Sequence, residues 1–473
     1  MTIRIPILAA LGGILIVTSA LTDSLSASDH TPKSSEPEFD KLDRFMQVFT
    51  APPTIAQEAL TYLESHWSTN DVPMAIEGSR FIRSRDMLFK WFDVLEKKTR
   101  KSYSDNWSAW SSWIWQQPTK LPDNYAEFKS RLYRRIDPRF AKYFDGNPAH
   151  TIRLDEIVWG GVVQDGIPPL RSPKMISAKD ADYLEDSNVI FGLEVNGDVR
   201  AYPKRILAWH EMFVDTVGGV PVAGVYCTLC GSMILYETET QGTNHAIGTS
   251  GFLYRSNKLM YDRKTNSLWS TLEGTPVVGS LFGKDIYLPR RSVVTTTWGE
   301  WKKRYPESKV LSLDTGHTRD YGEGVAYRDY FATDKLMFPV PGEDKRLANK
   351  AEIVGILLPD TQQILENSYT PLAVDSAYLN KHPLYHSESN GVPFIIVTDK
   401  SGANRIYERN AKQTFKSWDG KNTLKDASGK TWRLTEAKLT SSDGKALKRL
   451  PGHRAFWFGW KAAFPDTKLV SLK

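Results

Sequence analysis

The stretch VPVAGVYCTLCGS, residues 220–232, holds Cys227 and Cys230, the only two cysteines of the 473-residue chain. An apolar run leads into the first thiol, and a second one, residues 233–236, follows the second thiol. This pattern predicts a strand, a tight turn and another strand. Two thiols three residues apart with glycine behind them form a knuckle, in which backbone N–H groups can point at the sulfurs. Such a turn can supply half of a metal site or close a small disulfide.

The knuckle lies among short β-type runs separated by glycine-containing turns, whereas the residues before Pro148 have helical periodicity. Helices are predicted over residues 54–67, 79–103 and 125–143. Trp107, Trp110 and Trp113, spaced three apart, are expected to face inward. We therefore predict an α-helical domain over residues 38–148 and a β-rich unit over residues 149–315.

A long internal repeat follows from the C-terminal residues. The segment WGEWKKRYPESKVLSL, residues 298–313, matches WFGWKAAFPDTKLVSL, residues 457–472, at identical spacing. The match extends backwards over more than a hundred residues, which indicates a duplicated unit. The predicted fold class is therefore α+β: a helical N-terminal domain, then two tandem β-rich units (sandwich or barrel-like), each ending in a Trp-rich helix. Residues 316–352 form the connector and residues 353–473 the second, degenerate unit.

Only the first copy carries sulfur. Where it has Cys227 and Cys230, the second copy has Thr398 or Asp399 and about Ser401. The thiols are therefore not needed to build the unit, and features found in one copy only are candidates for function.

The first 27 residues resemble an export signal. Arg4 precedes an apolar run over residues 5–20, and small residues follow at 25–27. We expect residues 28–37 to be a disordered linker and the mature protein to be periplasmic or secreted, without a stable membrane span. An uncleaved N-terminal anchor is the alternative. The net charge of +6 is scattered along the chain, which argues against nucleic acid as a partner.

Several long motifs resemble one known family. They read DEIVWGGVVQDGIPPL (155–170), AYPKRILAWHE (201–211) and SGFLYRSNKLMYDRKTNSLW (250–269). Together with the knuckle and the Trp-rich helices, they make residues 150–472 similar to the bacterial family catalogued as domain of unknown function 3179. Thr228 departs from that family's pattern, in which proline is usual. The resemblance implies an exported bacterial or archaeal protein and implies no activity.

A metal centre at the knuckle would need ligands beyond the two thiolates, because structural zinc sites have four. Cys2His or Cys2His2 ligation suits zinc, and copper is plausible in an exported protein. Asp262 and Arg263 could line a polar pocket and join the cysteines as catalytic candidates. For Asp262 a structural ion pair and turn is the favoured interpretation, because Asp426 stands at the matching position of the second copy. The candidate metal ligands are Cys227, Cys230 and His210, with His245, Glu211 and Asp215 as further candidates.

Two other interpretations of the cysteines stay open. In a redox dithiol, a Cys-X-X-Cys pair usually begins a helix, whereas here strand residues follow. In a structural disulfide, the closed loop is too small to add much stability through chain entropy. The sequence thus predicts an exported metal-binding or redox enzyme, for instance a metal-dependent oxidoreductase, that acts on a small molecule or a metal ion. The alternative is a non-enzymatic binding or scaffold protein with a structural Cys227–Cys230 disulfide.

Overall fold

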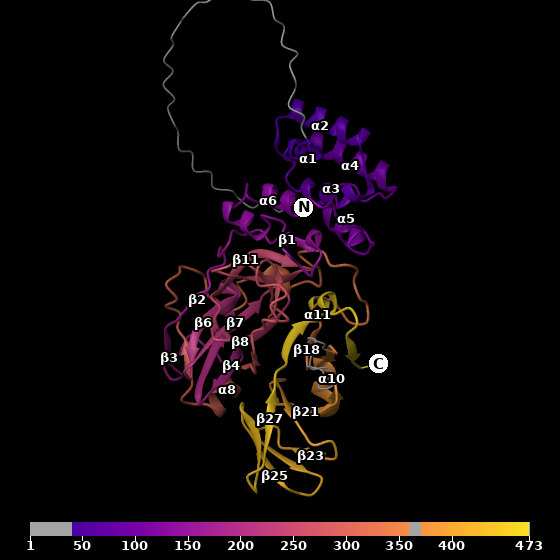
Figure 1. The fold of residues 1–473 in the computed structure, drawn as a ribbon. Coiled ribbons are helices and arrows are strands. Elements are labelled where there is room, and N and C mark those ends of the chain that lie inside the picture. The colour runs from indigo at the N-terminus through magenta and orange to yellow at the C-terminus, as the bar shows by residue number, and fades with distance from the viewer. Residues whose placement is uncertain (1–39, 359–369, 473) are drawn as a thin grey trace, which may run out of the picture. The chain divides into compact units, whose positions relative to one another are not determined.

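A helical region precedes a β-rich region in the computed structural model, as the sequence predicts (Figure 1). The structure describes residues 40–358 and 370–472. The predicted export signal (1–27) and linker (28–37) lie outside the described residues. No helix among the described residues has the length and apolarity needed to cross a membrane.

The helical region differs from the prediction where chain breakers act. The helix predicted over residues 79–103 is shorter in the structure and spans Arg85–Thr99. An earlier helix ends at Ser79, the chain turns, and Ser84 caps the new helix by accepting a hydrogen bond from the Met87 N–H (3.3 Å). The helix predicted over 125–143 ends at Tyr133, and a short 3-10 helix begins at Pro138. The helix bounds are α1 Lys41–Thr50, α2 Pro53–Ser65, α3 Val72–Ser79, α4 Arg85–Thr99, α5 Trp107–Ile114 and α6 Tyr125–Tyr133.

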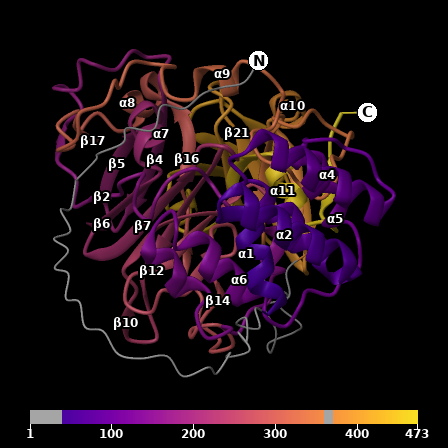
Figure 2. The same ribbon diagram turned by 90° about the horizontal axis from the view of Figure 1, so that it is seen from above.

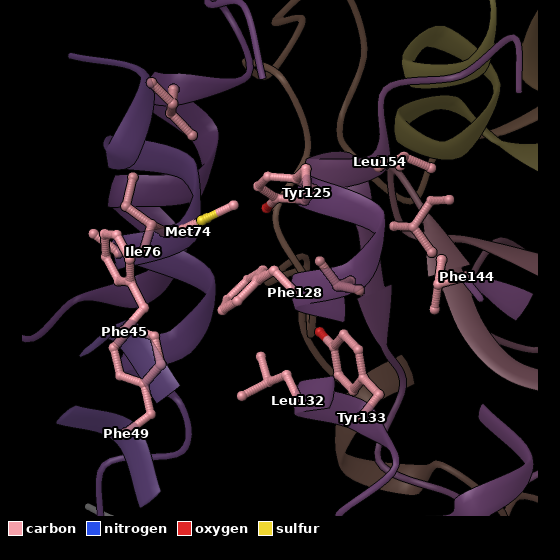
Figure 3. Packing of buried hydrophobic residues seen from close by; sticks show 14 of the residues in the cluster. Phe45, Phe49, Met74, Ile76, Tyr125, Phe128, Leu132, Tyr133, Phe144 and Leu154 are labelled. Carbon is pink, nitrogen blue, oxygen red and sulfur yellow. The ribbon is translucent and has the colours of Figure 1, made fainter. Parts of the chain in front are cut away.

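Aromatic side chains fill the core of the helical region. Figure 3 shows Phe49 of α1 and Phe128 of α6 facing each other, and their ring centroids are 6.2 Å apart. Lys129, fully buried on α6, pairs with Glu77 of α3 (2.5 Å) and donates to the Ile157 carbonyl of the β-rich region (2.6 Å). Burial lowers the pKa of Lys129. Since a buried charge must be paired, this contact joins the two regions firmly.

The first part of the β-rich region contains three five-stranded sheets, with strand orders β16-β4-β5-β17-β3, β15-β8-β7-β6-β2 and β1-β11-β12-β13-β14, and the hairpin β9-β10. The strand bounds are β1 Ile157–Trp159, β2 Leu170–Arg171, β3 Met175–Ser177, β4 Val189–Val195, β5 Asp198–Pro203, β6 Met212–Val217, β7 Val220–Cys227, β8 Ser232–Glu237, β9 Glu239–Thr240, β10 Thr243–Asn244, β11 Ile247–Tyr254, β12 Asn257–Asp262, β13 Leu268–Ser270, β14 Pro276–Val278, β15 Arg290–Arg291, β16 Val294–Thr297 and β17 Lys309–Leu311. The helices here are α7 Lys204–His210, α8 Trp298–Arg304 and α9 Arg328–Phe331.

The second part contains a four-stranded sheet, β28-β18-β19-β29, and an eight-stranded sheet, β20-β21-β22-β27-β26-β25-β24-β23. The bounds are β18 Glu352–Ile356, β19 Leu372–Asp375, β20 Leu384–Ser389, β21 Val392–Thr398, β22 Asn404–Glu408, β23 Phe415–Trp418, β24 Thr423–Asp426, β25 Thr431–Leu434, β26 Lys438–Ser441, β27 Ala446–Leu450, β28 His453–Phe456 and β29 Lys468–Val470, with helices α10 Ser376–Lys381 and α11 Trp457–Ala463. The edge strands β20 and β23 meet where the Phe415 N–H donates to His386 Nε2 (2.9 Å), so the sheet is barrel-like.

The two parts share a strand order. The order β16-β4-β5-β17, visible in Figure 2, corresponds to β28-β18-β19-β29. Within each set of four strands, only the last pair is parallel. Each Trp-rich helix then makes the same contact. The Trp301 Nε1–H donates to Ser308 Oγ (2.9 Å), and the Trp460 Nε1–H donates to Thr467 Oγ1 (2.8 Å). Both indoles are fully buried.

Glycine allows each indole to lie flat on its sheet. An added Cβ would lie 2.3 Å from a Trp301 ring carbon at Gly192, and 2.3 Å from a Trp460 ring carbon at Gly355. We expect Gly355→Ala to lower the free energy of unfolding by about 1–3 kcal/mol through overpacking, as measured by chemical denaturation. The penalty should shrink in a Trp460→Phe background, whereas an equal loss in both backgrounds would contradict this contact.

Candidate functional site

The knuckle forms the predicted strand, turn and strand. Strands β7 and β8 pair antiparallel with Cys227 opposite Ser232, which leaves residues 228–231 to make the turn. Gly231 has a φ of +61°, a conformation that glycine adopts without strain. This turn brings the two Cα atoms within 5.3 Å, and a disulfide joins Cys227 to Cys230.

The disulfide is closed off from solvent. Cys227 and Cys230 are 2% and 1% exposed, and both belong to the apolar cluster that also contains the helical core. The nearest polar contact of a sulfur is the Ser256 carbonyl, 3.3 Å from Cys230 Sγ. The sulfurs therefore lie in packed protein.

The connector and the second part close over the turn. The Tyr330 hydroxyl of α9 donates to the Leu229 carbonyl (2.8 Å), and the Phe456 N–H donates to the Cys230 carbonyl (2.7 Å). Helix α11 approaches so closely that a Cβ at Gly459 would lie 3.1 Å from Cys230 Cβ. Two segments far from the disulfide turn in the chain, α9 and the junction of β28 with α11, thus meet at it.

His210, the first predicted nitrogen ligand, has other partners. It ends α7 and is fully buried. Its Nδ1 lies 2.9 Å from the Pro168 carbonyl, and its Nε2 lies 2.6 Å from the Tyr321 hydroxyl. Since a carbonyl only accepts, Nδ1 carries the proton and Nε2 accepts from Tyr321. The imidazole is therefore a hydrogen-bonded core group.

Burial lowers the pKa of His210 to about 4, against about 6.5 in an unfolded chain. Between these two values the unfolded chain binds a proton that the folded protein does not, so stability falls as the pH drops through this window. The variant His210→Gln keeps a donor and an acceptor. When the pH is lowered from about 7.5 to about 5, we expect its melting temperature to fall less than that of the wild type. Thermal denaturation at both pH values measures this, and parallel losses would contradict the assignment.

Glu211 and Asp215 are each neutralised by a cation. Glu211 pairs with the buried Lys258 (3.2 Å), and Asp215 pairs with Arg200 of β5 (2.5 Å). Glu211 has a φ of +54°, which ends α7. Each of the two carboxylates therefore has a cationic side chain as its partner.

The remaining candidates lie in a second cluster. His245, one of the candidate metal ligands, is 5% exposed, because its ring packs on Trp269 and its Nδ1 lies 3.3 Å from Asp262. The Asp262 carboxylate also accepts backbone N–H bonds from Lys264 and Thr265, which fits the structural turn. Asp262 is thus a turn residue with a buried imidazole behind it.

Arg263 lies 3.3 Å from Asp165, in the segment 155–170. Asp165 also accepts from the Tyr261 hydroxyl (2.7 Å) and the Thr249 N–H (3.0 Å). The structure therefore uses Arg263 to fasten this segment onto β11 and β12, and it is half-exposed.

Within the described residues, no group of three or more His, Cys, Asp or Glu side chains is placed to hold a metal ion. Lys258 was not among the residues predicted for the site. It is 4% exposed, donates to the Glu211 carbonyl and pairs with the Glu211 carboxylate. Burial lowers the pKa of Lys258. The same Glu211 carbonyl accepts from the Tyr226 N–H (2.9 Å), one residue before Cys227. The sequence signal for the buried role of Lys258 was only that a lysine stands within a run that otherwise resembles a strand.

The family model described as "Protein of unknown function (DUF3179)" matches residues 164–467 of the chain. This range includes the knuckle, the connector and most of the second β-rich part. No curated protein and no solved structure matches the chain.

Proposed function

Since the chain belongs to the DUF3179 family of proteins of unknown function, we propose from the knuckle geometry that it is an exported, non-enzymatic binding protein with a structural Cys227–Cys230 disulfide. The observation that carries this proposal is the burial of both sulfurs, which are bonded to each other inside the apolar core. A redox or metal-ligating thiolate needs access and an environment that favours charge, and apolar burial disfavours it.

In this proposal the disulfide turn is a clasp. It presents the Leu229 and Cys230 carbonyls at fixed positions, and Tyr330 and the Phe456 N–H bind to them. The disulfide adds little through the entropy of so short a loop, so its contribution is to hold these acceptors in place. The second copy has no clasp because Asp399 orders its turn instead, accepting from Ser401 and Arg405.

A redox enzyme is the second candidate. It is favoured by the Lys258–Glu211 pair, which is held beside Tyr226 and could move a proton near a nascent thiolate. A metal-dependent oxidoreductase with zinc or copper has less support. His210, Glu211, Asp215 and His245 are each engaged with other protein groups.

Redox trapping separates these functions. The oxidised protein is equilibrated with dithiol buffers under native conditions, and free thiols are then tagged with a maleimide that shifts the mass. A structural clasp should stay oxidised down to about −300 mV while the same protein in denaturant becomes fully tagged. A reversible native midpoint between about −120 and −270 mV would overturn the proposal in favour of the redox enzyme.

We also propose that the β-rich region arose by duplication, with residues 149–315 and 353–473 as the two units. The repeated Trp-rich segments, the common strand order and the matched indole contacts support it. The loss of the thiols from the second unit then marks the clasp as a specialisation of the first.

A further inference from the structure

A cavity of about 520 Å³ lies in the helical region, between the junction of α1 and α2, the start of α4 and the residues after α6. Its size is within the range of small-molecule sites. Most of the residues that line it are apolar, although polar atoms make up the larger share of its exposed surface. The apolar residues that matter here are Phe49, Ala56, Met87, Phe81, Ile82 and Ile136.

The charged residues that line this cavity are two arginines, Arg83 and Arg135. They come from separate elements, the loop before α4 and the turn after α6, and both are exposed. Within residues 40–358 and 370–472, neither guanidinium has an ion-pair or side-chain hydrogen-bond partner. The neighbouring Arg134 and Arg139 do have carboxylate partners, Asp145 (3.8 Å) and Asp137 (2.7 Å).

Two unpaired guanidiniums beside one apolar cavity form a site of defined chemistry. A guanidinium presents a planar fork of donors that matches a carboxylate or phosphate group. The apolar side chains of the lining favour a ligand that removes their hydrocarbon surface from water. A ligand that satisfies both halves has a hydrocarbon body and a single anionic head.

We propose that this cavity binds a single-chain anionic amphiphile, with the head group at Arg83 and Arg135 and the hydrocarbon chain against the half-buried Phe81, Ile82 and Ile136. The inference deepens the proposed binding function and rests on it for the expectation of a ligand. It does not depend on the state of the disulfide, because the cavity lies wholly in the helical region.

Calorimetric titration of the full chain with dodecanoate below its micelle concentration tests the proposal. We expect saturable binding that weakens about tenfold or more in Arg83→Gln and in Arg135→Gln, since each loses a charge-assisted contact. Arg134→Gln is the matched control, because Arg134 is adjacent in sequence but does not line the cavity, and its affinity should equal that of the wild type. Dodecanol, which has the same chain without the charge, should bind wild type and both arginine variants alike.

Ile82→Trp, at the half-buried wall, should block dodecanoate and dodecanol together while circular dichroism shows an unchanged fold. Dodecyl phosphate in place of dodecanoate shows whether a phosphate or a carboxylate head is preferred, and saturable binding of either supports the site. Absence of saturable binding by both anions, or equal affinity in wild type and the Arg83→Gln variant, would overturn the inference. A reversible redox midpoint of the native disulfide would overturn the proposed clasp, but it would leave the expected results of these titrations unchanged.

Discussion

Replacing Lys258 by methionine is expected to lower the free energy of unfolding by about 3–5 kcal/mol, because it leaves the Glu211 carboxylate buried without its cation. The Lys258 and Glu211 side chains are only 5% and 9% exposed, so water cannot replace the lost ammonium. Chemical denaturation followed by circular dichroism measures the loss.

Two variants control this result. The double variant Lys258→Met/Glu211→Gln removes both charges and should recover most of the lost stability. Lys97→Met breaks the pair with Glu64, whose side chains are 69% and 36% exposed, and should cost less than about 1 kcal/mol. A Lys258→Met loss no larger than that of Lys97→Met would mean that the buried pair does not support the knuckle.

The second large effect is expected at Arg405, a fully buried guanidinium in the second β-rich part. Arg405 pairs with Asp399 and with Glu436, each at 2.7 Å. All three side chains are buried, so Arg405→Leu leaves two carboxylates without their main cation. We therefore expect the free energy of unfolding to fall by about 3–5 kcal/mol. Arg304 of α8 also reaches Asp399 (3.4 Å), so the network joins α8 to the second β-rich part.

The control for Arg405 is Arg433→Leu on the exposed side of β25, which should change stability by about 0.5 kcal/mol or less. Denaturant titration of both variants gives the comparison. If the free energy of unfolding of Arg405→Leu equals that of Arg433→Leu within error, the network is not needed to hold the second β-rich part.

The parts of the fold that depend on local pattern could be predicted from the sequence. Strand β7, the turn and strand β8 follow from two apolar runs around CTLCG, and α8 follows from its tryptophan spacing and the proline after it. The start of α4 at Arg85 was missed, because the capping action of Ser84 is hidden inside a continuous apolar stripe.

The contacts that decide the site could not be predicted, because they join residues far apart in the chain. His210 and Tyr321 are 111 residues apart, and Tyr330 reaches Leu229 over 101 residues. No spacing rule connects such pairs, so His210 looked available as a ligand. The same limit applies to Lys258, whose burial depends on its pairing with Glu211.

The central claim is that the disulfide turn holds the connector and α11 in place. Hydrogen–deuterium exchange of the wild type and the double variant Cys227→Ala/Cys230→Ala tests it most directly. We predict faster exchange in the variant at residues 328–331 and 453–463, with unchanged protection in α1 to α6 and in the barrel-like sheet, because stability is lost locally where the clasp acts. Unchanged exchange at residues 328–331 and 453–463 would contradict the account.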